Sequence, residues 1–167
     1  MWNLISEQLK GHPERLAVAR VLVENGLSVK GDKIYCNEIR IPAIEVARAA
    51  KVDRRTVTET IRTINEREKL REIFSNLRSA GYSLKQIAQN LGFGVVEITP
   101  KDPKTVGILA EAAALIAEEG ISIRQALVDD PELSPEPQLT LITEKPLPGE
   151  LIPKFLRIKG RPKVTIY

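Results

Sequence analysis

Residues 95–128 read VVEITPKDPKTVGILAEAAALIAEEGISIRQALV, and this stretch decides the fold of the second half of the chain. Val96 and Ile98 alternate with polar residues, which predicts a half-buried strand. Two prolines around Asp102 end that strand and precede a helix, which Gly120 terminates before a second alternating segment. The apolar stripe expected along this helix consists of Val106, Leu109, Ala113, Ile116 and Ala117. The pattern therefore predicts strand, loop, helix and strand in that order.

The loop and the two ends of this helix resemble the ACT domain, a small ligand-sensing module of amino-acid metabolism. Asp102 in the loop, Gly-Ile-Leu at 107–109 and Gly-Ile-Ser-Ile at 120–123 carry the resemblance. The remaining segments are expected to form a strand at 139–143, a short helix at 150–158 and a last strand at 164–166. The resemblance covers residues 93–167 and implies a ferredoxin-like βαββαβ fold.

The resemblance also implies that an amino acid binds between two copies of the ACT domain. A helix N-terminus offers N–H groups and partial positive charge to a carboxylate, and Asp102 is expected to accept the ammonium group. Ser122 and Arg124 are expected to approach from the neighbouring strand. The expected ligand-binding residues are Asp102, Lys104, Thr105, Val106, Gly107, Ile108, Ser122 and Arg124. The alternative is that Asp102 only shapes the loop and the module serves dimerisation alone.

Residues 42–64, PAIEVARAAKVDRRTVTETIRTI, form the second informative stretch. Pro42 opens a helix, Lys51 lies in a short turn, and Asp53 is a natural N-cap for a second helix. The inward face of that second helix is expected to carry Val57, Ile61 and Ile64. This arrangement resembles a helix-turn-helix, with Lys51 at the turn where that family usually has glycine.

The outward face of the second helix is predicted to contact double-stranded DNA. Arginine binds guanine edges or phosphates, and threonine bonds to phosphate or touches a thymine methyl group. The expected DNA-binding residues are Arg54, Arg55, Thr56, Thr58, Glu59 and Arg62. The alternative is an ordinary basic helical hairpin with a solvated face.

Charge is divided unevenly along the chain. Residues 1–92 hold 16 Lys+Arg and 11 Asp+Glu, whereas residues 93–167 hold 9 and 11. A basic first half joined to a mildly acidic second half fits a nucleic-acid module joined to another domain. We expect a helix-turn-helix domain over 1–80, a linker helix over 81–92 and an ACT domain over 93–167.

The first domain is expected to be all-helical apart from a small β-hairpin at 28–36, where Gly31-Asp32 is a turn signal. Residues 65–79 continue the helical pattern with an apolar stripe of Leu70, Ile73, Phe74 and Leu77. This connecting helix either pairs with its copy in a dimer or folds back on its own domain. The predicted class of the whole chain is α+β.

Residue counts argue against an enzyme. Cys36 and His12 are the only residues of their kinds, which excludes an intrachain disulfide, a cysteine metal cluster and the usual triads. No apolar run approaches the ~18 residues of a membrane span, and the first residues lack the layout of a signal peptide. We expect a cytoplasmic protein that has no cofactor and no membrane association.

The whole architecture resembles the archaeal predicted regulators of amino-acid metabolism, which carry a helix-turn-helix in front of an ACT domain. The resemblance implies a homodimer, or a higher even oligomer, formed through the ACT domain. An amino acid bound there would change the spacing of two DNA-reading helices. The alternative is a non-DNA-binding regulatory subunit that docks on an amino-acid biosynthetic enzyme.

Overall fold

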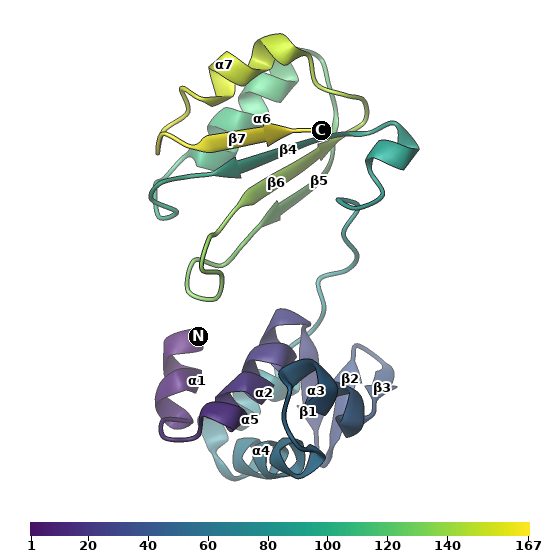
Figure 1. The fold of residues 1–167 in the computed structure, drawn as a ribbon, viewed down its shortest axis with the longest axis vertical. Coiled ribbons are helices and arrows are strands. Elements are labelled where there is room, and N and C mark those ends of the chain that lie inside the picture. Colours follow the sequence, from purple (N-terminus) through teal and green to yellow (C-terminus); the bar gives the residue numbers. More distant parts are fainter. The chain divides into compact units, whose positions relative to one another are not determined.

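The computed structural model describes residues 1–167, and the chain divides into two compact units, Met1–Gly81 and Tyr82–Tyr167 (Figure 1). Seven α-helices and two antiparallel sheets confirm the predicted α+β class. No helix has the length and apolar character needed to cross a lipid bilayer.

The first unit combines five helices with a three-stranded sheet. Its elements are α1 (Trp2–Gln8), α2 (Pro13–Glu24), β1 (Leu27–Lys30), β2 (Lys33–Cys36), β3 (Ile39–Ile41), α3 (Ala43–Ala50), α4 (Arg54–Glu66) and α5 (Glu68–Asn76). Helix α2 packs against α3, α4 and β1. The largest fully buried side chains of this unit are Ile5, Leu9, Leu22, Ile34, Ile64, Leu70 and Phe74. Helix α2 therefore lies at the centre of the packing.

The sheet of the first unit is larger than the sequence predicts. The hairpin of β1 and β2 turns at Gly31, whose φ is +60°, and this part of the prediction is confirmed. Strand β3 then pairs with β2 after a second turn at Asn37, whose φ is +54°. The prediction of a lone hairpin is wrong because a strand of three residues gives too short an alternation to recognise.

The helical pattern over residues 65–79 is broken into two helices. Arg67 has an extended backbone (φ −105°, ψ 111°), so α4 ends before it and α5 starts after it. Helix α5 packs against α4 and β1, and its Leu70 and Phe74 are fully buried. Of the two alternatives, the connecting helix folds back on its own unit and does not extend as a free pairing helix.

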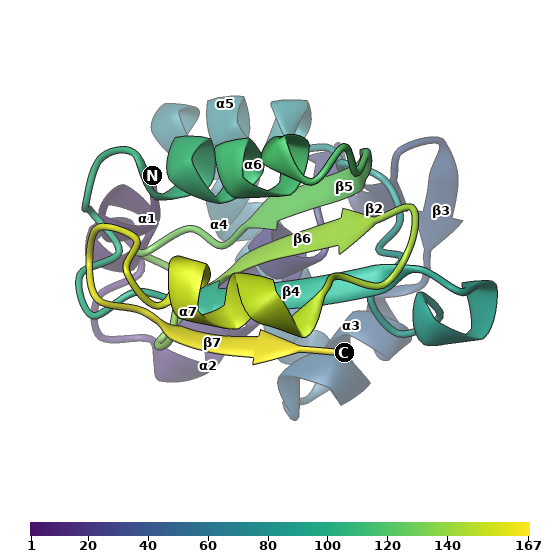
Figure 2. The same cartoon turned by 90° about the horizontal axis from the view of Figure 1, so that it is seen from above.

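The second unit is a four-stranded sheet with helices on one face. Its elements are β4 (Gly94–Thr99), α6 (Ile108–Glu118), β5 (Ile123–Val128), β6 (Leu139–Thr143), α7 (Ile152–Phe155) and β7 (Lys163–Ile166). The strand order is β5-β6-β4-β7, and all neighbouring strands are antiparallel. Helices α6 and α7 lie over the same face of this sheet (Figure 2). A short 3-10 helix, Gly149–Leu151, precedes α7.

The buried face of α6 differs from the predicted stripe. Ile108, Ala112 and Ile116 face the core, whereas Val106 is 87% exposed and Leu109 is 44% exposed. The helix begins at Ile108, after the predicted stripe has started. Because its sequence ILAEAAALIAE is apolar almost all round, the spacing alone does not select one face.

The predicted linker helix over 81–92 is wrong. The segment forms turns and a 3-10 helix, Gln89–Leu91, and it belongs to the second unit. Ala88 is buried with Val95 and Ile142 on the sheet face opposite α6, and Leu84 and Phe93 pack against them. Packing of this segment against the sheet buries Ala88, Val95 and Ile142. This burial favours the irregular path over a free α-helix.

Candidate functional site

Helices α3 and α4 are joined by a tight turn. Lys51 adopts the left-handed conformation (φ 55°, ψ 44°) that glycine usually supplies, and its N–H donates to the Arg48 carbonyl at 3.2 Å. The Asp53 carboxylate then accepts a hydrogen bond of 2.6 Å from the Arg55 N–H, which confirms the predicted N-cap of α4. The turn directs α4 away from α3 without a glycine.

The inner face of α4 carries the residues predicted for it. Val57, Ile61 and Ile64 are buried at 0 to 5% exposure. Thr60 and Thr63 are also buried, and each hydroxyl donates to a carbonyl four residues earlier in the helix. These bonds satisfy the hydroxyls within α4, so the inner face packs without unpaired polar groups.

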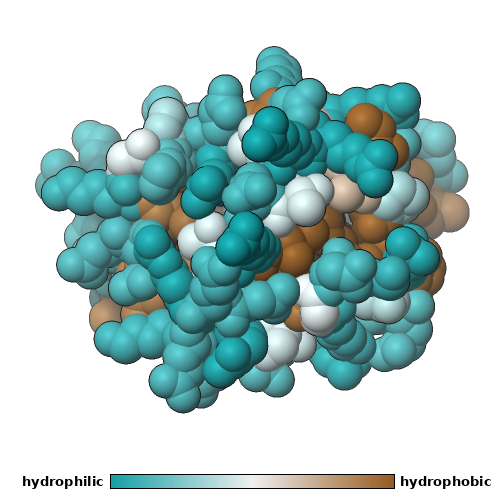
Figure 3. All heavy atoms as spheres, turned by 90° about the horizontal axis from the view of Figure 1, so that it is seen from below, coloured by the Kyte–Doolittle hydropathy of each residue, from teal (hydrophilic) through white to brown (hydrophobic).

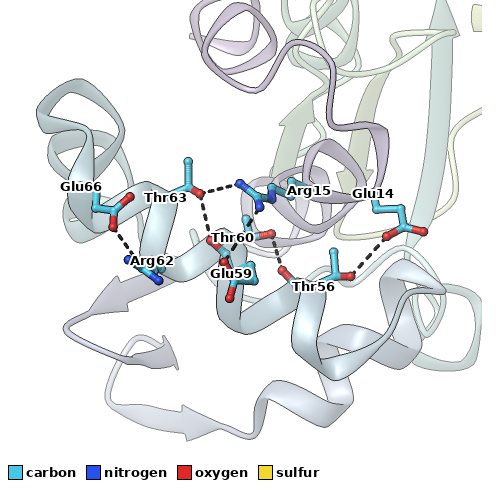
Figure 4. Close-up of polar contacts among 8 residues, drawn as sticks. All are labelled: Glu14, Arg15, Thr56, Glu59, Thr60, Arg62, Thr63 and Glu66. Carbon is cyan, nitrogen blue, oxygen red and sulfur yellow. Dashed lines mark hydrogen bonds and ion pairs between the residues drawn. The ribbon is translucent and has the colours of Figure 1, made fainter.

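Two of the predicted DNA-binding residues face α2 (Figure 4). The Thr56 hydroxyl donates to the Glu14 carboxylate at 3.2 Å. The Glu59 carboxylate lies 4.0 Å from the guanidinium of Arg15, which also donates to the Thr63 hydroxyl at 2.9 Å. These contacts hold Thr56 and Glu59 in the packing between the two helices.

The other four predicted DNA-binding residues are exposed: Arg54, Arg55, Thr58 and Arg62. Arg62 donates to Glu66 at 2.8 Å, and this hydrogen bond raises the pKa of Arg62 above its usual value (Figure 4). Arg54 and Arg55 have no ion-pair partner. Their positive charges are therefore available to an anion.

Helix α4 forms a ridge between two hollows. The larger hollow, of about 690 Å³, lies between α4 and the strands β2 and β3, and Arg54, Thr58 and Arg62 line it from the helix. The smaller one, of about 500 Å³, lies towards the start of α2 and is lined by Arg55. Figure 3, the view from below, shows a mostly hydrophilic surface in which apolar atoms are visible in separate patches between the hydrophilic side chains.

Sequence reasoning missed part of the larger hollow. Arg40 of β3 and Asn65 at the end of α4 line it without having been predicted, and Lys33 of the β1–β2 hairpin lines the wall opposite α4. Lys33 pairs with Asp32 at 3.5 Å, whereas Arg40 is exposed and has no ion-pair partner. The only available signal was the Ile39-Arg40-Ile41 alternation, which places Arg40 on the face opposite two apolar residues.

Two local hydrogen bonds, both accepted by Asp102, hold the loop before α6. The Asp102 carboxylate accepts a hydrogen bond of 3.0 Å from the Lys104 N–H, and the Asp102 carbonyl accepts one of 3.1 Å from the Thr105 N–H. Gly107 is the N-cap of α6 with a φ of +99°, and no side chain caps the helix. The first N–H groups of α6 therefore have no side-chain acceptor.

A cleft of about 210 Å³ opens beside the start of α6. Three predicted ligand-binding residues line it, namely Thr105, Gly107 and Ile108. The end of β5 and the loop before β6 supply residues that the sequence analysis missed, including Val128, Asp129 and Gln138. Asp102, Lys104 and Val106 are exposed in the loop but do not line the cleft.

Ser122 lies at the opposite end of the sheet from this cleft. Thr143 pairs with both Ile123 and Gly94, so the start of β5 lies beside the start of β4. The loop with Asp102 follows the other end of β4, whose six residues span about 20 Å at ~3.3 Å per residue. Within one copy of the chain, the structure does not bring Ser122 to the loop.

Arg124 is engaged on the other face of the sheet. Its guanidinium lies 5.0 Å from the centroid of the Phe93 ring, in the cluster opposite α6. This stacking is a cation–π contact and does not point towards the start of α6. Arg124 is therefore not a neighbour of the cleft in the same copy.

An ion pair supports the first turn of α6 from the segment before β7. The Glu111 carboxylate accepts from the Lys159 backbone N–H at 3.0 Å, and the Lys159 ammonium lies 3.1 Å from it. The backbone hydrogen bond is the main cause of a lowered pKa of Glu111. Glu111 therefore remains ionised with its charge directed at Lys159.

Comparison with known proteins gives no assignment: no family model and no curated protein matches this chain.

Proposed function

We propose that the protein is an amino-acid-responsive transcriptional regulator that binds DNA through α3 and α4 and senses an amino acid in its second unit. The observation that carries the first part is the ridge of α4 between two hollows. Arg40, Arg54 and Arg55 are exposed there without ion-pair partners. A protruding cationic helix is suited to a polyanion with a groove.

The dimensions of the ridge support DNA as that polyanion. An α-helix with its side chains is about 10–12 Å across, and the major groove of B-DNA is about 12 Å wide. The sharp turn at Lys51 and the cap at Asp53 support a helix-turn-helix in which α4 enters the groove. Arg54, Thr58 and Arg62 would then face base edges or the flanking phosphates from one side of α4.

The second unit supports the sensing role. Two helices on one face of a sheet ordered β5-β6-β4-β7 are the arrangement expected of a ferredoxin-like ACT domain. The cleft beside α6 has the size of a small metabolite, and the uncapped N–H groups suit its carboxylate. Strand β5 is an edge strand, so a second copy paired along it would cover the cleft from the side.

Regulation requires that the amino acid prefer one arrangement of the dimer. A ligand shifts an equilibrium only by the difference between its affinities for the two states. A ligand held between two second units would favour one spacing of the two first units. That spacing decides whether both α4 helices reach successive turns of one DNA face, about 34 Å apart.

The DNA-binding part is tested by fluorescence anisotropy with a mixed-sequence duplex at several salt concentrations. We expect affinity to fall steeply with salt, because cations on the protein displace counterions from phosphates. Arg54→Ala should weaken binding about tenfold. The matched control is Arg48→Ala on α3, which removes an exposed arginine that lines neither hollow.

Absence of salt-dependent affinity for any duplex would contradict DNA binding. Co-purification with an amino-acid biosynthetic enzyme would then support the alternative, in which the basic first unit docks on that enzyme. Equal loss of affinity in Arg48→Ala and Arg54→Ala would show diffuse charge attraction and not a docked α4.

A further inference from the structure

We infer that the cleft beside α6 takes an amino acid with a compact aliphatic side chain, and that Asp129 receives its ammonium group. This inference rests on the proposed amino-acid sensing and adds the ligand class and a residue that the sequence analysis did not select. The inference is based on the volume of the cleft and on the chemistry of the residues that line it.

The volume favours a small ligand. A cleft of about 210 Å³ holds the equivalent of about seven water molecules at ~30 Å³ each. Valine, leucine and isoleucine have a comparable number of non-hydrogen atoms. A side chain as large as that of tryptophan or arginine would extend well beyond the cleft.

The walls limit the polarity of the ligand. Most of the lining side chains are apolar, among them Ile108, Leu109, Val128 and Leu139. No lysine or arginine lines the cleft, so an acidic side chain would lose its hydration without gaining a cation. An aliphatic side chain would bury its surface against these walls at little cost.

The acidic group of the cleft is Asp129 and not Asp102. Asp129 lies at the end of β5, where its N–H donates to the Gln138 carbonyl at 3.0 Å and its Oδ2 accepts from the Gln138 N–H at 3.2 Å. This reciprocal pair fixes the carboxylate at the wall of the cleft and leaves Oδ1 free. The Asp102 carboxylate is used within its own loop and does not line the cleft.

The two charged ends of an amino acid match two sides of the cleft. Gly107 opens the first turn of α6, where uncapped N–H groups and the Thr105 hydroxyl are available to the carboxylate. Asp129 lines the cleft from a different element, at the end of β5, and is available to the ammonium group. The side chain of the ligand then lies between them against the apolar walls.

The test is thermal unfolding of the full chain with each of the twenty amino acids, with 4-methylpentanoate and with 3-methylbutylamine. The last two compounds are leucine without its ammonium group and leucine without its carboxylate. A ligand that binds only the folded state raises the midpoint as its concentration rises. We expect the largest shifts from leucine, isoleucine or valine, and at least tenfold weaker binding of both analogues.

Three variants locate the ammonium site. Asp129→Asn should weaken leucine binding about tenfold or more, because a charge-assisted hydrogen bond is lost. Asp102→Asn and Asp130→Asn should bind leucine like the unmodified protein, because neither side chain lines the cleft. Both asparagines keep an oxygen that accepts the local turn hydrogen bonds of Lys104 and Glu132.

The outcomes separate this inference from the proposed function. A largest shift with serine, aspartate or lysine would overturn the aliphatic class while sensing itself stands. Loss of binding in Asp102→Asn with normal binding in Asp129→Asn would overturn the assignment of Asp129. Twenty flat traces would contradict amino-acid sensing and, with it, this inference.

Discussion

Helices α4 and α6 begin in opposite ways, and the difference underlies the two modes of binding that we propose. At α4, the Asp53 side chain accepts a hydrogen bond from the Arg55 N–H, so the helix start is satisfied internally. At α6, Gly107 provides no side-chain cap, and the helix start opens beside a cleft. In the proposed function, α4 contacts its partner through side chains, whereas α6 contacts its ligand through backbone N–H groups.

The surroundings of the two helices strengthen this contrast. Exposed arginines without ion-pair partners flank α4, and its inner face is fixed by α2 and α5. The cleft beside the start of α6 is lined mostly by apolar residues, and Asp129 is its one carboxylate. A rigid cationic ridge suits a large anionic surface, while a small apolar cleft with two polar ends suits a small zwitterion.

The largest expected effect is on stability, from removing the buried Phe74 side chain of α5. Phe74→Ala deletes a fully buried side chain and should lower the free energy of unfolding of the first unit by about 3–5 kcal/mol. The second unit should unfold as before, because its core contains none of this packing. Calorimetry of the full chain measures both transitions.

Ile73→Ala is the control for that variant, because Ile73 is only half-buried in the same helix. A smaller loss in Ile73→Ala is expected. Equal losses in the two variants would show that α5 does not dock through Phe74.

A smaller effect is expected from Arg40, which the sequence analysis did not select. Arg40→Ala should weaken binding to duplex DNA about tenfold and lower the slope of log affinity against log salt by about 1. The cause is the loss of one phosphate contact from the wall opposite α4. An unchanged slope would restrict the DNA contact to α4 and contradict a role for the β2–β3 wall.

The capping hydrogen bond of α4 is expected to have a smaller effect, on the stability of the first unit. Asp53→Ala should cost about 1 kcal/mol of stability in the first unit, and Asp53→Asn only a few tenths, because asparagine also accepts the Arg55 hydrogen bond. Chemical denaturation of the three proteins measures the difference. Equal losses in both variants would indicate that the charge of Asp53, and not its capping bond, stabilises α4.

The smallest effect concerns the start of α6 and depends on pH. Glu111 has a pKa below its ordinary value of 4.5, first because the Lys159 N–H donates to it and then because of the Lys159 side chain. A lowered folded-state pKa stabilises the fold above the unfolded-state pKa, and the stabilisation is lost as pH falls through the folded-state value. Glu111→Gln should therefore melt at a lower temperature than the unmodified protein at pH 7, with the difference shrinking below pH 4.5. A difference that grows on acidification would contradict the ion pair with Lys159.

Local signals in the sequence predict much of the fold. The strand at 139–143, the N-cap at Asp53 and the inward face of α4 are confirmed. Each depends on neighbours within a few residues, such as an alternation or a side chain that reaches its own backbone. Features that depend only on nearby residues can therefore be predicted from a single sequence.

Features that depend on tertiary packing were not predictable in this way. No proline or glycine marks the break at Arg67, which results from the docking of α5 on α4 and β1. Helical spacing alone places Thr56 on the outward side of α4. In the structure, however, its hydroxyl donates to the Glu14 carboxylate of α2. Asp129 lies far from Gly107 in sequence, and only the sheet brings both to one cleft.

The central claim is that one chain couples DNA binding to an amino acid, and the most direct test is the affinity of the full chain for duplex DNA with and without saturating leucine. The account predicts salt-dependent binding whose dissociation constant changes at least fivefold with leucine, in either direction, and does not change with leucine in Asp129→Asn. Binding that leucine leaves unchanged, although leucine raises the melting temperature, would contradict coupling between the two units.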